Sequence, residues 1–306
     1  MSTSITTTYA GEFAGKYISA ALLSADTLEG GGITIKPNVK FKEVLKTLST
    51  NALVKDAACD FADQSVVTLA ERILQPEEFQ VNLELCKKDF RSDWEAIEMG
   101  YSAFDTLPPS FADFLLGHIA AKVAQKTEQT IWTGVNATAG EFDGFATLLA
   151  ADATVIDVVG TAVTAANVIA EMGKVVDAIP TSVYGKEDLY IYVSSKIARA
   201  YVRALGGFGA NGLGANGVSA MGTTWFNGGD LAFDGVKLFV CSGMADDDMV
   251  AAQKSNLYFG TGLLSDHNEV KLIDMADLDG SQNVRVVMRY TAGVQTGIGA
   301  DIVYYT

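Results

Sequence analysis

The chain has 306 residues, of which 49% are hydrophobic and 19% charged, a composition that argues against disorder over most of its length. Its 37 acidic and 22 basic residues give a formal net charge of −15, which repels phosphate backbones and anionic lipids and disfavours general nucleic-acid or membrane binding. The polar start and the lack of a long apolar run predict neither a secretion signal nor a membrane span.

The first third of the chain changes from a helical to an extended pattern. Apolar residues at four-residue spacing predict a short amphipathic helix over residues 13–22, and Gly30 to Gly32 end it and permit a hinge. Alternating apolar residues then predict strands over Ile33–Phe41, Val66–Leu74 and Phe79–Leu85. Because two or three strands cannot bury their own apolar face, this ribbon is expected to pack on a neighbouring subunit.

A long helix is predicted over residues 110–132. The pair Pro108 and Pro109 begins it abruptly, Ser110 is placed to cap its first turn, and Gly134 ends it. At about 1.5 Å per residue, such a helix extends roughly 33 Å, which is long enough to organise a domain.

The following hundred residues alternate helix and strand, which predicts an inserted α/β domain over residues 144–243. Helices are expected over Thr164–Ile179 and from Ser195 to Leu205, with a strand at Leu189–Val193 between them, before a glycine-rich loop at 206–222. Further strands are predicted at Val236–Val240, Leu257–Phe259, Val270–Ile273, Val284–Tyr290 and Ile302–Tyr305.

The chemical motifs in the sequence do not add up to a catalytic, cofactor or metal site. The glycine-rich loop matches G-x-G-x-x-G twice, but a helix precedes it and no amphipathic helix follows, the reverse of a dinucleotide site. His118 and His267 are the only histidines, so no H-E-x-x-H metal site can form. A nicotinamide-dependent oxidoreductase, which would rest on this loop, is the alternative from another functional class.

Taken in order, the arm, ribbon, long helix, inserted α/β domain and β-rich return resemble the Hong Kong 97-type major capsid proteins of tailed bacteriophages. The amino-acid sequences of three segments are also similar to those of phage coat proteins, namely Glu84–Trp94, Asp188–Leu205 and Lys254–Leu264. The resemblance implies an α+β fold. Its parts would be an N-arm (1–32), an extended E-loop (33–77), a P-domain (78–143) with a spine helix (110–132), an A-domain (144–243) and a return to the P-domain sheet (244–306).

The resemblance further implies a structural protein, not an enzyme, that binds no cofactor and assembles with itself. Hexamers and pentamers would form an icosahedral head around double-stranded DNA without sequence-specific binding, in the virion after assembly in the host cytoplasm. The resemblance implies a separate scaffolding protein and a portal as partners, and it implies no binding to a membrane. Candidate subunit contacts are Lys36, Lys40, Phe41, Lys42, Glu71, Arg72, Arg203 and Phe208. An encapsulin-type compartment shell, which uses the same fold, is an alternative.

Overall fold

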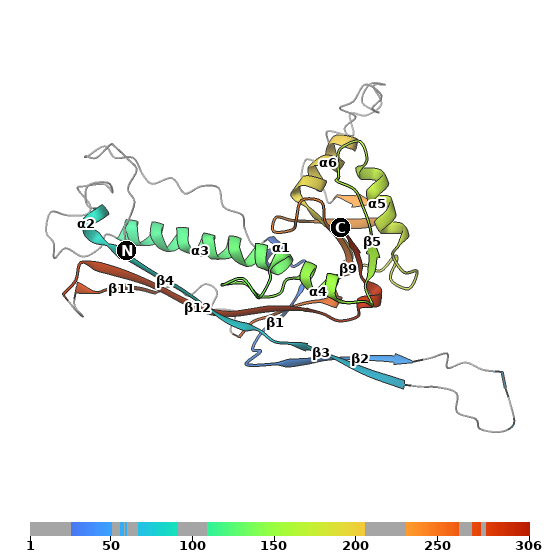
Figure 1. Cartoon of the computed structure of the whole chain (residues 1–306), viewed down its shortest axis with the longest axis horizontal. Helices are drawn as coiled ribbons and strands as arrows, with labels where there is room; N and C mark the ends of the chain where they lie inside the picture. The colour runs from blue at the N-terminus through green and yellow to red at the C-terminus, as the bar shows by residue number, and fades with distance from the viewer. Residues whose placement is uncertain are drawn as a thin grey trace.

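The computed structural model of the chain contains two sheets, a projecting two-stranded ribbon and the helices that cover the sheets (Figure 1). The structure describes residues 26–50, 56–57, 59, 67–90, 109–205, 231–262, 271–276 and 280–306. The helix expected over residues 13–22 and the glycine-rich loop at 206–222 therefore lie outside the described residues.

The five-stranded sheet is organised around β12, Asn283–Thr296. Along most of its length β12 pairs antiparallel with β4, and it also pairs with β11 and β10, while β1 adds to β10 in parallel. These partners are β1 (Thr34–Lys36), β4 (Glu77–Cys86), β10 (Leu257–Gly260) and β11 (Lys271–Asp274). In β12 the buried Val284, Val286 and Met288 alternate with the exposed Arg285 and Arg289, so one face of the sheet is apolar.

The long helix α3, Pro109–Thr133, runs beside the β4 and β12 strands (Figure 1). Its bounds lie within one residue of the predicted 110–132 at each end, so the sequence-based prediction is confirmed. The buried Ile131 and Trp132 near its end pack in a cluster with Phe259 and Ala292 of the sheet. A short helix, α2 (Lys87–Phe90), directly follows β4.

The six-stranded sheet carries α5 (Val168–Asp177) and α6 (Ser195–Leu205). Its strand order is β5-β13-β9-β6-β8-β7, with β13 parallel to β5, β6 parallel to β8, and the other neighbours antiparallel. The strands are β5 (Ile156–Val158), β6 (Leu189–Ser194), β7 (Ala232–Phe233), β8 (Val236–Cys241), β9 (Met249–Gln253) and β13 (Val303–Tyr305). One apolar cluster joins both helices to this sheet, as the burial of Val168, Met172, Ile191 and Ile197 shows.

A second apolar cluster joins the two sheets. It contains side chains of α3, of α4 (Phe145–Ala151) and of both sheets, namely Trp132, Phe145, Tyr192, Cys241, Phe259, Val294 and Ile302. The short helix α1 (Asp26–Glu29) and the 3-10 turns η2 (Lys254–Asn256) and η4 (Gly299–Asp301) also occur in the structure. The shared core means that the two sheets belong to one folded body.

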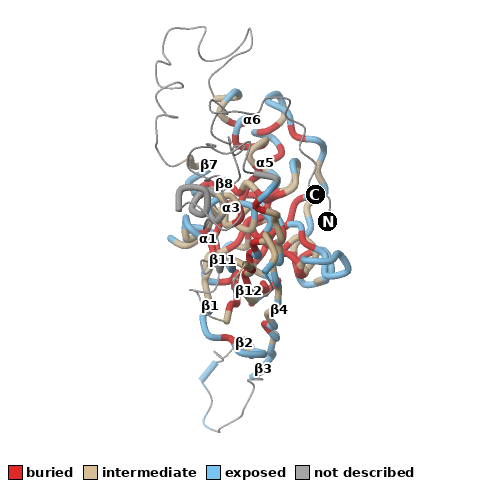
Figure 2. Tube along the Cα trace, turned by 90° about the vertical axis from the view of Figure 1, so that its left-hand side faces the viewer, coloured by how far each residue is buried: buried red, intermediate tan, exposed pale blue. Residues whose placement is uncertain are grey.

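The ribbon consists of β2 (Glu43–Thr50) and β3 (Val67–Leu74), paired antiparallel. It projects from the body below the five-stranded sheet (Figure 1), and most of its tube is coloured as exposed in Figure 2. Each strand of eight residues spans roughly 26 Å at about 3.3 Å per residue. The third predicted extended segment, Phe79–Leu85, is not part of this ribbon, because β4 pairs with β12 in the sheet.

Several sequence-based predictions of elements are corrected by the structure. The strand expected over Ile33–Phe41 stops at Lys36, because Pro37 is followed by Asn38 with a φ of 63°, a left-handed conformation that ends the extended run. The helix expected from Thr164 begins only at Val168, because the Asn167 side chain first accepts a hydrogen bond from the Thr164 amide at 2.7 Å.

Some helices and strands were not predicted from the sequence, and the strands of residues 244–306 were wrongly expected to join a single sheet. Helix α4 and the strands β2 and β9 were not predicted. Helix α4 is short, β9 is apolar without alternation, and in β2 the adjacent apolar residues Val44 and Leu45 break the alternation. Residues 244–306 do not all join one sheet: β10, β11 and β12 lie in the five-stranded sheet, whereas β9 and β13 pair with each other in the six-stranded sheet. The reason is that β9 pairs with β6, which draws the end of the chain to that side.

Candidate assembly surface

One face of the ribbon is apolar and exposed. The strand register places Val44 opposite Ile73 and Leu48 opposite Leu69, with Val67 further out on the same face. The exposed fractions of Leu48 and Leu69 are 63% and 74%, and the other three side chains are between 44% and 55% exposed. We call these five residues the apolar ribbon face. Large apolar side chains gathered at this exposure on one face are typical of a surface that another protein covers.

The apolar ribbon face carries one charged pair. Lys46 and Glu71 lie opposite each other between the two apolar pairs, and both are exposed. Opposite charges at directly facing positions stabilise an antiparallel pair modestly, by about 0.2–1 kcal/mol. Glu71, one of the predicted contact residues, therefore lies on the exposed face.

The opposite face of the ribbon anchors it to the body. Leu74 is fully buried and Leu45 is 9% exposed. A β-carbon added at Gly260 in β10 would lie 2.9 Å from Leu74 Cδ2, so the glycine is what lets the leucine approach the sheet so closely. Burying a leucine side chain of this kind contributes about 1.5–3 kcal/mol.

Polar contacts fix the base of the ribbon as well. Lys36 Nζ pairs with Glu43 Oε1 at 3.0 Å, and the Gln295 amide donates to the Ile73 carbonyl at 2.9 Å. Arg72, a second predicted contact residue, forms an ion pair with Asp152 and donates to Thr296 Oγ1 at 3.1 Å. In the isolated chain, Lys36 and Arg72 thus serve contacts within the chain.

The loop between β1 and β2 presents an aromatic side chain flanked by lysines. Phe41 is 70% exposed, and the Lys42 ammonium lies 5.3 Å from the centroid of its ring, within the range of a cation–π contact. Lys40 is exposed on the other side of Phe41. These three predicted residues lie together at the base of the ribbon.

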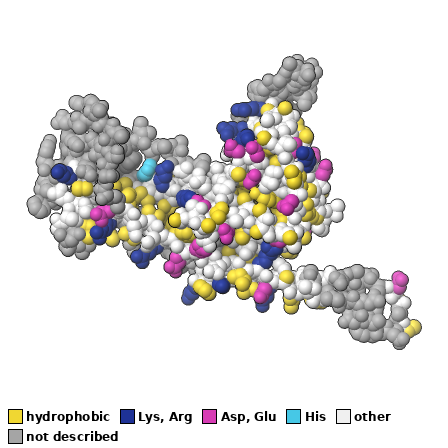
Figure 3. Space-filling model, in the orientation of Figure 1, with side chains coloured by type: hydrophobic (Ala, Val, Ile, Leu, Met, Phe, Trp, Pro, Cys, Tyr) yellow, Lys and Arg dark blue, Asp and Glu magenta, His cyan; other side chains and the backbone are white. Residues whose placement is uncertain are grey.

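The remaining predicted residues lie elsewhere. Arg203 is exposed on α6, where Figure 3 shows Lys and Arg side chains gathered at the upper end of the molecule. Arg199 is exposed one turn earlier on the same helix. Phe208 lies outside the described residues. The predicted contacts therefore fall in at least two places, the ribbon with its base and the α6 helix.

A buried carboxylate holds the first described helix against α3. Glu128 has no exposed surface, and its two oxygens accept hydrogen bonds from the Thr27 hydroxyl at 2.6 Å and the Thr27 amide at 3.2 Å. The Trp132 indole in turn donates to Thr27 Oγ1 at 2.8 Å. Burial raises the pKa of Glu128, the bonds from Thr27 oppose this shift, and the nearby Asp26 adds to it. Sequence reasoning missed this residue, since nothing in a single helical glutamate indicates burial.

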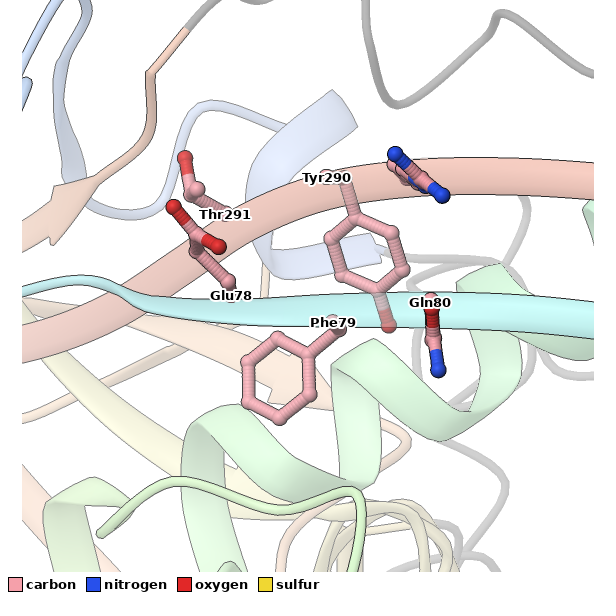
Figure 4. A pocket seen from close by; sticks show the side chains of 6 residues that line it. Glu78, Phe79, Gln80, Tyr290 and Thr291 are labelled. Atoms are coloured by element: carbon pink, nitrogen blue, oxygen red, sulfur yellow. The ribbon is translucent and has the colours of Figure 1, made fainter.

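A cavity of ≈ 590 Å³ lies along β4 and β12 (Figure 4). Its lining consists of Glu78, Phe79, Gln80, Arg289, Tyr290 and Thr291. The rings of Phe79 and Tyr290, from neighbouring strands, have centroids 5.6 Å apart, so they pack as an aromatic pair. These six side chains include no cysteine, histidine or paired carboxylates, so they form no acid–base or nucleophilic arrangement.

The part of the chain that the structure describes offers neither a metal-ligand cluster nor a membrane-spanning helix. Within it, no three His, Cys, Asp or Glu side chains come together as metal ligands. None of the helices in the same ranges combines the length and apolar character needed to cross a bilayer.

The mixed α+β architecture, with a long helix beside one sheet, a second sheet carrying two helices and a projecting ribbon, is the Hong Kong 97-type capsid fold. Solved capsid structures of phages and related particles match almost the whole chain. One from Mycobacterium phage Ogopogo has a TM-score of 0.62 and 12% identity, covering 95% of this chain and 94% of that chain.

Other matches are of the same kind. The capsid of the native GTA particle has a TM-score of 0.60 at 12% identity, over 95% of this chain and 93% of that chain. The capsid of cyanophage P-SCSP1u has a TM-score of 0.56 at 13% identity, over 100% and 94% of the two chains. No protein-family model and no curated protein matches the sequence. At these identities the likeness establishes the fold.

Proposed function

We propose that this chain is a major capsid protein of a tailed phage, a structural subunit that assembles with copies of itself into an icosahedral head around double-stranded DNA. One observation carries the proposal: the apolar ribbon face projects from the body and is exposed among the residues that the structure describes. The fold shared with phage and GTA capsids over nearly the full length supports it. The net charge of −15 suits a wall that encloses DNA without adhering to it.

The parts expected from the resemblance keep their assignments in this proposal. The N-arm is residues 1–32, the E-loop 33–77, and the P-domain 78–143 with α3 as its spine helix. The A-domain is 144–243. The predicted return over 244–306 is narrowed to β10, β11 and β12 of the five-stranded sheet, because β9 and β13 lie in the six-stranded sheet. The ribbon of one subunit would lie over the P-domain of its neighbour, and A-domains would meet in hexamers and pentamers.

Several modest contacts are sufficient for such a shell. Burying the apolar ribbon face removes five partly exposed aliphatic side chains from water, and each is worth about 0.7–2 kcal/mol when the usual transfer value is scaled by its exposed fraction. A subunit that donates one ribbon and receives another is held twice, and linked contacts add avidity without any single tight interface. A separate scaffolding protein and a portal are further proposed partners, with assembly in the host cytoplasm and the finished protein in the virion.

The test is a truncation that spares the body. Deleting Lys46–Glu71 and joining Leu45 to Arg72 through Asn-Gly removes the projecting strands, and it retains Leu45, Arg72 and Leu74 at the base. The full chain is expected to form uniform shells by electron microscopy and light scattering, whereas the truncated chain remains folded and unassembled. Uniform shells from the truncated chain would contradict the proposal. Shells that enclose a cargo enzyme and no DNA would favour the encapsulin alternative.

A further inference from the structure

The ribbon is tied at its base to elements of both sheets. Two of the ties lead to the five-stranded sheet: Gln295 of β12 donates to the Ile73 carbonyl at 2.9 Å, and Lys36 of β1 pairs with Glu43 at 3.0 Å. Arg72 reaches further, because its ion-pair partner Asp152 lies in the turn that leads from α4 to β5 in the six-stranded sheet.

Arg72 lies where the chain passes from one sheet to the other. Thr296, which accepts a hydrogen bond from Arg72 Nη1 at 3.1 Å, is the last residue of β12, and the chain continues through η4 into β13. The Arg72 guanidinium therefore links the ribbon to two segments that lead into the six-stranded sheet. One is the turn from α4 to β5, and the other is the connection from β12 to β13. A lysine could not make both contacts with the same geometry, because its charge is a single point.

Asp152 is itself held in place for this contact. Its Oδ1 accepts hydrogen bonds from the Thr154 amide at 3.0 Å and the Thr154 hydroxyl at 2.7 Å, and its Oδ2 is left to face Arg72. The Asp152 side chain is 15% exposed and the Arg72 side chain 28% exposed, so solvent screens the pair only in part.

We propose that Arg72 is a positioning residue, which through Asp152 and Thr296 sets the direction of the ribbon relative to the six-stranded sheet. The ribbon acts as a lever: with strands roughly 26 Å long, a rotation of about 10° at the base moves the far end by about 5 Å. In a shell, neighbours contact both the ribbon and the six-stranded sheet unit. The direction of the ribbon then fixes the angle between neighbouring subunits, and through it the curvature and diameter of the shell. This consequence rests on the proposed function.

The direction of the ribbon can be measured on the unassembled subunit. Spin labels at Thr50→Cys on the ribbon and Lys186→Cys beside the six-stranded sheet, with Cys59 and Cys86 replaced by Ser, report the separation by pulsed electron resonance. Arg72→Met removes both contacts with little loss of bulk. Asp152→Asn is the milder second variant, because its amide oxygen still accepts from Thr154. Lys237→Met, which removes a positive charge from the exposed side of β8 and leaves the ribbon untouched, is the control.

Arg72→Met and Asp152→Asn are expected to shift or broaden the distance distribution by about 5 Å. They should also give shells of altered or broadened diameter, whereas Lys237→Met changes neither. Distance distributions equal to that of the unsubstituted chain in both variants would overturn the role of Arg72. If the unsubstituted chain forms no shells, the proposed function fails, and the distance measurement on the subunit still decides the positioning role.

Discussion

Replacing Leu48 and Leu69 by serine removes the most exposed cross-strand pair of the apolar ribbon face. Their side chains are 63% and 74% exposed in the isolated chain, so the subunit gains little from them. If a neighbour covers them, each contributes about two thirds of the 1.5–3 kcal/mol of a fully buried leucine, or about 1–2 kcal/mol. The pair then supplies about 2–4 kcal/mol per ribbon contact.

The loss of this free energy raises the assembly threshold, which is the lowest subunit concentration at which shells form. Each subunit donates one ribbon, so the lowest concentration at which shells form should rise by about 30-fold to 900-fold in Leu48→Ser with Leu69→Ser. The assay is light scattering across a dilution series, with electron microscopy of each sample. Urea unfolding of the subunit should show a change within about 1 kcal/mol.

The matched control is the neighbouring cross-strand pair on the other face. Thr47 lies opposite Ala70 in the register, and replacing both by serine changes the same two strands without touching the apolar ribbon face. This variant should assemble at the unsubstituted threshold. Equal thresholds for the leucine variant and the unsubstituted chain would refute the reasoning. A large loss of subunit stability would instead mean that the leucines pack within the chain.

Three further substitutions test the interior. Leu74→Ala should lower the free energy of unfolding by about 2–5 kcal/mol in urea titrations, because the side chain is fully buried against β10. Thr27→Val should cost about 1–3 kcal/mol, since it leaves a Glu128 oxygen and the Trp132 indole without their shared hydroxyl partner. Because the pKa of Glu128 is raised on folding, its favourable contribution is complete below its ordinary value of 4.5 and is lost as pH rises through the raised value. Compared with Glu128→Gln, the unsubstituted subunit should therefore lose stability as the pH rises above the ordinary carboxyl pKa of 4.5, and parallel stability profiles would contradict this.

Much of the architecture could be predicted from local patterns. The bounds of α3 followed from Pro109 at its start, the helical rhythm and Gly134 after its end, signals that act within a few residues. The strands β3, β6, β8 and β10 were found within one or two residues, because alternation or a short apolar run marks each of them. The same patterns predicted a ribbon, but of its predicted segments only Val66–Leu74 belongs to the observed one, whose other strand, β2, was not predicted.

Other features depend on contacts between distant residues. The sequence suggests Lys36 and Arg72 as contacts with neighbours, which stays a prediction, but it does not reveal that they also form ion pairs with Glu43 and Asp152 within the chain. It did not identify Leu48 or Leu69, because in β2 apolar residues occur on both faces and only the pairing with β3 decides which face is exposed. A charged residue in a strand, such as Arg72, does not reveal that its ion-pair partner Asp152 lies 80 residues further along the chain.

By itself, the sequence indicated the long helix, many of the strands and the acidic charge balance, because these follow from periodicity and composition; that a partner covers the ribbon stays a prediction. Only the tertiary structure decided which face of the ribbon is free, that Glu128 is buried beneath Thr27, and that β9 and β13 belong to the six-stranded sheet. The physical reason is that burial and pairing are set by packing among segments remote in sequence, whose energies no local pattern contains.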